Sequence, residues 1–205
     1  MARLWHLAVV LTLAGGAASF VTNRPEAWQV ADTSRDRLLA LDVYEHFVPN
    51  VVYAGRALAA GGSALVWDPL QHCGQPFAAF NGLWYPLHWL LVVFGIDVGL
   101  RLLVASKLLI GGLFAYLLGR DLGARPLAAL IGALAFQLGN AATHVASWTP
   151  LVLEPFMWFP AVFLCVERLL RAPSARCVVA LGAASCMALL PAWPQLVVFL
   201  YQLAL

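Results

Sequence analysis

Three side chains that can bind protons or cations stand close together in the first quarter of the chain. Asp42, Glu45 and His46 occupy the polar side of a stretch with helical periodicity. A carboxylate or an imidazole can take a proton from a hydroxyl group, and a carboxylate can hold a cation that polarises a phosphate. The alternative is that these groups only solvate the polar face of a helix.

Two further ionisable residues lie inside apolar runs, where a charge is costly and often functional. Glu154 could snorkel to a nearby surface, cap a helix end or line a polar pocket. Asn140 and His144 lie toward the same predicted side, so a pocket shared with Asp42 is compatible with the pattern. Lys107 falls in the middle of a run, where it would bind a phosphate or pair with a carboxylate on a later helix that this sequence does not contain.

The composition places the elements that carry these residues in lipid. Hydrophobic residues make up 62% of the 205 residues and charged residues 11%, whereas about a quarter of an ordinary soluble domain is charged. A membrane helix needs about 20 mostly apolar residues. We therefore predict an all-α integral membrane protein, a polytopic helix bundle with a large first extracytoplasmic loop. The predicted spans are residues 4–21, 98–118, 127–142, 151–166, 178–190 and a partial span at 195–205, where we expect the sequence to be truncated.

The arginine residues predict the orientation of these spans. Short cytoplasmic loops collect Lys and Arg. With the amino terminus inside, the cytoplasmic ends hold Arg3, Arg120, Arg125, Arg168, Arg171 and Arg176. The first run could instead be a cleaved secretory signal, because Ala17-Ala18-Ser19 resembles a cleavage site. Both alternatives leave the next segment outside the cytoplasm.

The first outer loop, residues 22–97, is predicted to be folded. Apolar residues recur at three- and four-residue steps near 38–60, which indicates a helix lying in the membrane interface, with Pro49 kinking or dividing it. The apolar run 87–95 is too short to cross and is predicted to be interfacial or re-entrant. Turn-forming and aromatic residues between and beside these helices favour a compact loop. They are Trp67, Pro69, Gly74, Pro76, Tyr85 and Pro86.

These loop motifs resemble those of the YfhO-type bacterial membrane protein family, which belongs to the polytopic glycosyltransferases of the GT-C fold. The matching segments are residues 42–49, 65–69, 74–77 and 85–86, followed by 148–151, 167–168 and 194–195. The resemblance covers most of this chain but only the front part of a family member. It implies that this chain would be inactive alone and that activity belongs to the full-length protein.

The resemblance implies a bacterial inner-membrane enzyme that moves a sugar from a polyprenyl-phosphate donor to a cell-envelope acceptor on the outer face. Asp42 is the implied catalytic residue. The candidate substrate-binding residues are Tyr44, Glu45, His46, Lys107, His144 and Glu154. No cofactor is implied with certainty, although a divalent metal is compatible with the carboxylates.

Two other classes of function remain open. In a transporter or flippase of a lipid-linked intermediate, Lys107 and Glu154 would matter more than Asp42. In a non-catalytic envelope assembly factor, the outer loop would bind a partner. The net charge of +2 indicates no nucleic-acid partner, and the spacing of the four cysteines indicates no disulfide framework. The pattern does not indicate an oligomeric state.

Overall fold

The computed structural model describes residues 2–23, 48–62, 67–69, 73–76, 82, 84–140, 142, 150–191 and 194–204. These residues are almost entirely helical, so the predicted all-α fold is confirmed at this level. Two described helices, α1 (Ala2–Thr22) and α5 (Ile96–Asp121), are long and apolar enough to cross a membrane. The core helices of soluble proteins and signal sequences share these properties, so length and composition alone do not distinguish these cases.

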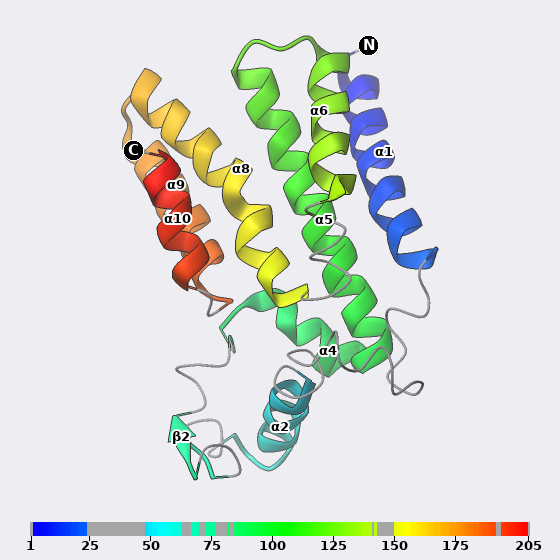
Figure 1. Cartoon of the computed structure of the whole chain (residues 1–205), viewed down its shortest axis with the longest axis vertical. Coiled ribbons are helices and arrows are strands. Elements are labelled where there is room, and N and C mark those ends of the chain that lie inside the picture. The colour runs from blue at the N-terminus through cyan, green and yellow to red at the C-terminus, as the bar shows by residue number, and fades with distance from the viewer. Residues whose placement is uncertain are drawn as a thin grey trace.

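The described helices α1, α5, α6 (Pro126–Leu138), α8 (Pro150–Arg171), α9 (Ala175–Leu189) and α10 (Pro194–Ala204) form a bundle (Figure 1). α5 packs against α1, α6 and α8, while α9 and α10 pack on α8. This central position follows from the sequence of α5, whose buried residues recur at three- and four-residue steps on one helix face. They are Leu100, Leu103, Val104, Lys107, Leu108 and Gly111.

Helices occupy the predicted apolar runs, but their ends differ from the predicted ends. The run 127–142 corresponds to α6, which ends at Leu138 because Gly139 adopts an extended backbone with ψ of 158°. The run 151–166 corresponds to α8, which continues to Arg171. An ion pair between Glu167 and Arg171, one helical turn apart, favours this extra turn.

The first helix is packed as part of the bundle core. Val9, Leu13, Ala17 and Val21, spaced four residues apart, form its buried stripe. The side-chain amide of Gln137 on α6 donates a 2.8 Å hydrogen bond to the Leu13 carbonyl, which ties α6 to α1 inside the bundle. α1 therefore contributes side chains to the same core as α5 and α6.

Leu13→Ala is expected to destabilise the mature protein by about 2–5 kcal/mol, because it leaves a cavity where three helices meet. The matched control is Leu11→Ala on the exposed side of the same helix, where we expect a change within about 0.5 kcal/mol. Thermal unfolding in detergent measures both. Equal unfolding temperatures for the two variants would indicate that α1 is absent from the mature protein or unpacked.

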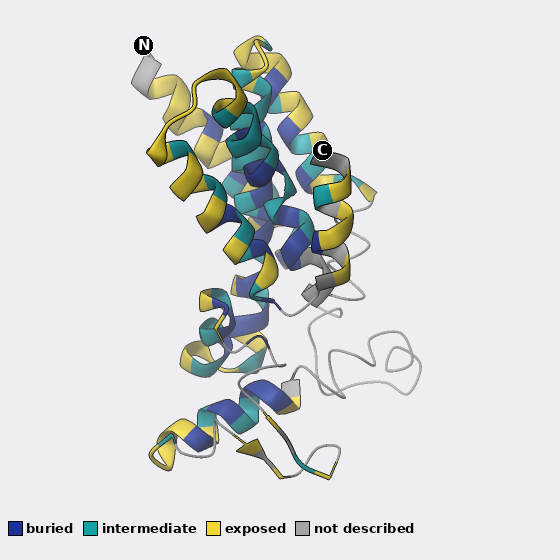
Figure 2. Ribbon diagram, turned by 90° about the vertical axis from the view of Figure 1, so that its left-hand side faces the viewer, coloured by how far each residue is buried: buried dark blue, intermediate teal, exposed yellow. Residues whose placement is uncertain are grey.

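A second layer lies at one end of the bundle, which we call the loop layer (Figure 2). It contains α2 (Val48–Ala59), the strands β1 (Trp67–Asp68) and β2 (Gln75–Pro76), the 3-10 helix η4 (Pro86–His88) and α4 (Trp89–Phe94). Both predicted interfacial segments contain helix here. Residues 38–47 of the first segment lie outside the described residues, so the predicted kink at Pro49, now the second residue of α2, stays a prediction.

Figure 2 shows buried residues along one side of α2, and that helix packs on α4. Its buried side carries Asn50, Val51, Ala54 and Ala57, whereas Leu58 is exposed. The strands pair antiparallel, with Trp67 opposite Pro76. The Tyr53 hydroxyl donates a 2.9 Å hydrogen bond to the Trp67 carbonyl, which fastens this hairpin to α2.

The corner between α4 and α5 is closed by a tight backbone contact. Gly95, with φ of +78°, ends α4 in a conformation that favours glycine. Four residues later, a Cβ atom at Gly99 would lie 2.5 Å from the Leu91 Cα atom. Only glycine allows this approach, which positions η4 and α4 against the end of the bundle.

Gly99→Ala is therefore expected to destabilise the protein by about 1–3 kcal/mol, because the new methyl group meets backbone atoms that cannot rotate away. Gly132→Ala is the matched control, since Gly132 is also helical and a Cβ atom added there would meet nothing within 4 Å. Alanine should leave that site unchanged or stabilise it by up to about 1 kcal/mol. Unfolding by denaturant titration compares the two, and a Gly99→Ala protein as stable as the control would contradict the tight corner.

Five arginines lie at the opposite end of the bundle, which we call the arginine end. At this end α5 and α8 finish and α6 and α9 begin (Figure 1). The residues are Arg120, Arg125, Arg168, Arg171 and Arg176. The fold thus gathers these five arginines at one end, whereas Arg56 and Arg101 lie at the loop-layer end.

Candidate functional site

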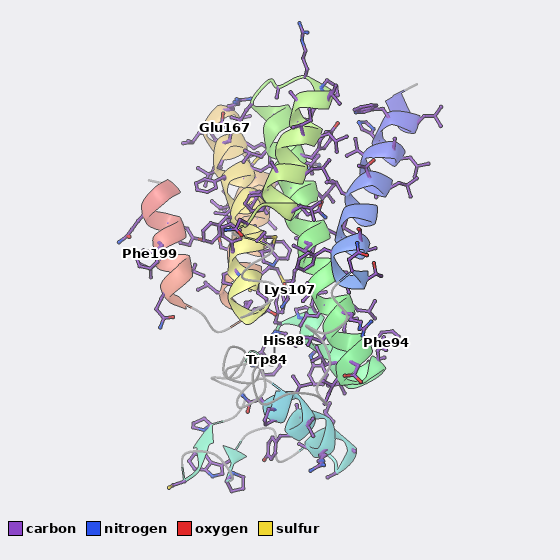
Figure 3. The ribbon with its side chains drawn as sticks, turned by 45° about the vertical axis from the view of Figure 1, so that its right-hand side comes forward. Trp84, His88, Phe94, Lys107, Glu167 and Phe199 are labelled. Atoms are coloured by element: carbon purple, nitrogen blue, oxygen red, sulfur yellow. The ribbon has the colours of Figure 1, made fainter. Side chains whose placement is uncertain are left out.

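A buried group of charged residues joins the loop layer to the bundle. We call His88 of η4, Lys107 of α5 and Glu154 of α8 the charge cluster. The two carboxyl oxygens of Glu154 lie 2.8 and 2.9 Å from Nε2 of His88, and Glu154 forms an ion pair with the Lys107 ammonium. Glu154 is fully buried, and the other two are almost so. Figure 3 shows His88 and Lys107 close together where the bundle meets the loop layer.

The second nitrogen of His88 determines which proton arrangements fit. Nδ1 lies 2.8 Å from the Gly82 carbonyl, which can only accept, so Nδ1 carries a proton. When Glu154 is ionised, Nε2 must also donate and His88 is an imidazolium. When Glu154 holds the proton, His88 is neutral. The observed distances fit both of these proton arrangements.

The backbone of Gly82 is shaped to receive His88. Its φ of +60° lies in the left-handed region, and a Cβ atom there would lie 2.8 Å from the Cε1 atom of the imidazole. A larger residue would push the ring away from its acceptor. Gly82 therefore contributes to the site through its carbonyl and through its missing side chain.

Tyr85 packs beside the cluster from the same loop segment. Its ring packs edge-on against the His88 ring, with the ring centroids 5.0 Å apart. Its hydroxyl accepts a 3.1 Å hydrogen bond from the Trp158 indole of α8. Burial, together with the negative charge of Glu154, raises the pKa of the phenol far above its ordinary value. Tyr85 therefore stays protonated at neutral pH, and Pro86 directly after it opens η4.

The charge cluster affects stability mainly because each charged group would be costly to bury without its partners. Moving an ion from water into a protein interior costs several kcal/mol, and pairing roughly repays this cost. Removing Glu154 would break its contacts with His88 and Lys107 at once, so Glu154 links η4, α5 and α8. Chemically the cluster can store and transfer one proton.

The structure brings together two of the predicted site residues. Lys107 and Glu154 are in direct contact, although the sequence suggested a Lys107 partner on a later helix and a Glu154 side chain that snorkels or caps. The partner of Lys107 is on a later helix of this same chain, and the snorkelling expectation for Glu154 was wrong, because α8 packs on α5 and turns Glu154 inward. Asp42, Tyr44, Glu45, His46 and His144 lie outside the described residues.

The predicted loop motif divides between two places in the loop layer. Tyr85 and Pro86 border the charge cluster. Trp67 and Gly74 belong to the hairpin region, where Gly74 lies against the Trp67 indole so closely that a Cβ atom would be 2.7 Å away. Pro69 and Pro76 are also in this region, and both are exposed.

Sequence reasoning missed His88, Gly82 and Trp158. The sequence feature that could have indicated His88 is its position, shortly after Pro86 at the start of the short apolar run 87–95. Within the part of the chain that the structure describes, no three His, Cys, Asp or Glu side chains are placed to hold a metal ion. The metal expectation concerned residues near Asp42, which are not described.

The fold and the site define an α-helical bundle with a loop layer fastened to one end through buried charges. Comparison with protein-family models, curated proteins and solved structures finds no match. The family resemblance seen in the loop motifs therefore remains a prediction from the sequence.

Proposed function

We propose that the protein acts as a membrane glycosyltransferase of the bacterial inner membrane. It moves a sugar from a polyprenyl-phosphate donor to a cell-envelope acceptor on the outer face. The resemblance of the loop motifs to the YfhO-type family supports this activity.

One observation carries the proposal: the loop layer and the arginine end lie at opposite ends of the bundle. Under the positive-inside rule the arginine end faces the cytoplasm. The loop layer then lies at the outer headgroup level, where the phosphate of a lipid-linked donor is found. The charge cluster holds that layer against the bundle, next to the lipid that carries the donor.

Asp42 is the proposed catalytic residue, and it lies shortly before α2 in the sequence. It would take the proton of the acceptor hydroxyl, or hold a divalent cation that polarises the donor phosphate. Tyr44, Glu45, His46 and His144 are proposed to bind substrate. Lys107 and Glu154 are now better explained as residues that position the loop layer, because their charges are satisfied by each other.

A transporter or flippase of a lipid-linked intermediate is the second candidate, and the buried Lys107–Glu154 pair favours it. Ionisable pairs inside helical bundles often mark proton or substrate paths. In this case Glu154→Gln would stop lipid movement while Asp42→Asn would not. Lipid movement and sugar transfer are measured separately, so the two functions are distinguishable.

The placement of the loop layer can be tested through Cys73, an exposed native cysteine beside the hairpin. In a variant that keeps only this cysteine, a membrane-impermeant maleimide is expected to label intact spheroplasts. The control is a single cysteine at exposed Leu122 in the turn of the arginine end, which should react only after permeabilisation. Labelling of Cys73 only after permeabilisation would contradict the proposed function, because the donor sugar is on the other side.

A further inference from the structure

The arginine end carries an excess of positive charge over a small area. It brings together five guanidinium groups and two carboxylates, those of Asp121 and Glu167, which leaves three positive charges in excess among the described residues. Figure 3 shows Glu167 at this end, far from His88. Four helices contribute to the surface, so the tertiary fold creates it.

Two of the arginines, Arg168 and Arg171, bind to other residues of the protein. Arg168 donates two hydrogen bonds to the Asp121 carboxylate, at 2.7 and 3.0 Å. Arg171 donates to the Asp121 carbonyl at 2.7 Å and pairs with Glu167 at 2.6 Å. Together these contacts tie the end of α5 to the end of α8. The carboxylates of Asp121 and Glu167 are both paired with arginine in this way.

The other three arginines are exposed and have no carboxylate partner in the described part of the chain. Arg120 donates to the Ala124 carbonyl at 2.9 Å, which uses one of its five N–H groups. Arg125 precedes the first turn of α6, and Arg176 lies in the first turn of α9. These guanidinium groups surround the same end of the bundle and can donate to an external anion.

Exposed apolar side chains alternate with these arginines. Leu127 directly follows the start of α6, and Val178 and Val179 follow Arg176 in α9. Leu170, 75% exposed, precedes Arg171. A soluble anion such as a nucleic acid would not contact these leucines and valines. A phospholipid would, because its acyl chains begin immediately beneath its phosphate.

We propose that the arginine end binds the headgroups of anionic phospholipids in the leaflet that surrounds it, with Arg120, Arg125 and Arg176 as the binding residues. The inference rests on the membrane insertion assumed in the proposed function. Guanidinium groups bind phosphate oxygens in pairs, and basic residues beside membrane helices attract anionic lipid. The neighbouring apolar side chains would contact the acyl chains of the same lipids.

The test uses the intact chain reconstituted in vesicles of phosphatidylcholine that contain spin-labelled phosphatidylglycerol or spin-labelled phosphatidylcholine. The relative association of the two labelled lipids with the protein is measured by electron paramagnetic resonance. Wild-type protein should prefer phosphatidylglycerol, and high salt should weaken the preference. The double variant Arg125→Gln/Arg176→Gln is expected to lower it about tenfold. Arg125→Lys/Arg176→Lys, which retains the charge, should keep most of it.

Arg56→Gln in α2 is the matched control, because Arg56 is exposed in the loop layer and should not affect lipid preference at the arginine end. Equal lipid preference in wild type and the double glutamine variant would overturn the proposed lipid surface, as would an equal loss with Arg56→Gln. Alkaline extraction of the same vesicles reports membrane insertion separately. Protein released by alkali would contradict the proposed function as well, whereas firm insertion without lipid preference would overturn only the lipid surface.

Discussion

Glu154→Gln is expected to lower the free energy of unfolding by about 3–5 kcal/mol. Glutamine keeps the size of the side chain, so packing against α5 is retained. It removes the negative charge of the carboxylate. That group forms an ion pair with the Lys107 ammonium and a hydrogen bond with the His88 ring. A buried ammonium would then lack its ion-pair partner. Denaturant or thermal unfolding of the purified protein in detergent measures the loss.

Glu167→Gln is the matched control for this prediction. Glu167 lies on the same helix and also forms an ion pair, but that pair is partly exposed to solvent. Exposed pairs contribute about 0–1 kcal/mol, so the control should unfold almost as wild type does. If the two variants lost equal stability, the charge cluster would have no special role in the fold.

A second variant measures how much of the loss depends on the pairing. In Lys107→Met the carboxylate of Glu154 remains buried without its lysine, and this variant should also be strongly destabilised. The double variant Lys107→Met/Glu154→Gln removes both ionic partners and should cost clearly less than the two single losses together. Additive losses would show that the two side chains act independently.

Asp42→Asn is expected to lower sugar transfer about 100- to 10,000-fold, the range by which a positioned acid or base contributes to catalysis. Asparagine keeps the shape but neither accepts the hydroxyl proton nor holds a cation well. The measurement is transfer of labelled sugar from a polyprenyl-phosphate donor by membranes that contain the full-length protein.

The control for this experiment is Asp97→Asn, an exposed carboxylate in the first turn of α5 at the loop-layer end. It should leave transfer within a factor of about two, because a surface substitution of this kind changes stability by only about 0.5 kcal/mol. Normal amounts of inserted Asp42→Asn protein with undiminished transfer would remove the proposed catalytic role. Loss of lipid movement in Glu154→Gln protein that is still folded and inserted, but not in Asp42→Asn protein, would then favour the transporter.

The sequence alone predicted the helices because the pattern that determines them is local. Apolar runs ended by glycine, proline and arginine are typical of helices wherever the chain later packs. Of the described helices only α1 and α5 are long and apolar enough to span a membrane, and α6 and α9 are shorter than a membrane span requires. The arginines of these runs also predicted a common end for α5, α6, α8 and α9, and the structure places those helix ends together. Helix ends were less well predicted, as at Gly139, because single backbone angles decide them.

Only the tertiary structure decided which charged residues meet. Lys107 and Glu154 were visible as ionisable residues in apolar runs, but 47 positions separate them. Their contact depends on the rotation of α8 against α5, which no local pattern determines. His88 joined them because the glycines at 82, 95 and 99 allow the loop layer to approach the bundle closely. A pattern along the chain can show that a buried charge needs a partner, whereas packing between helices selects that partner.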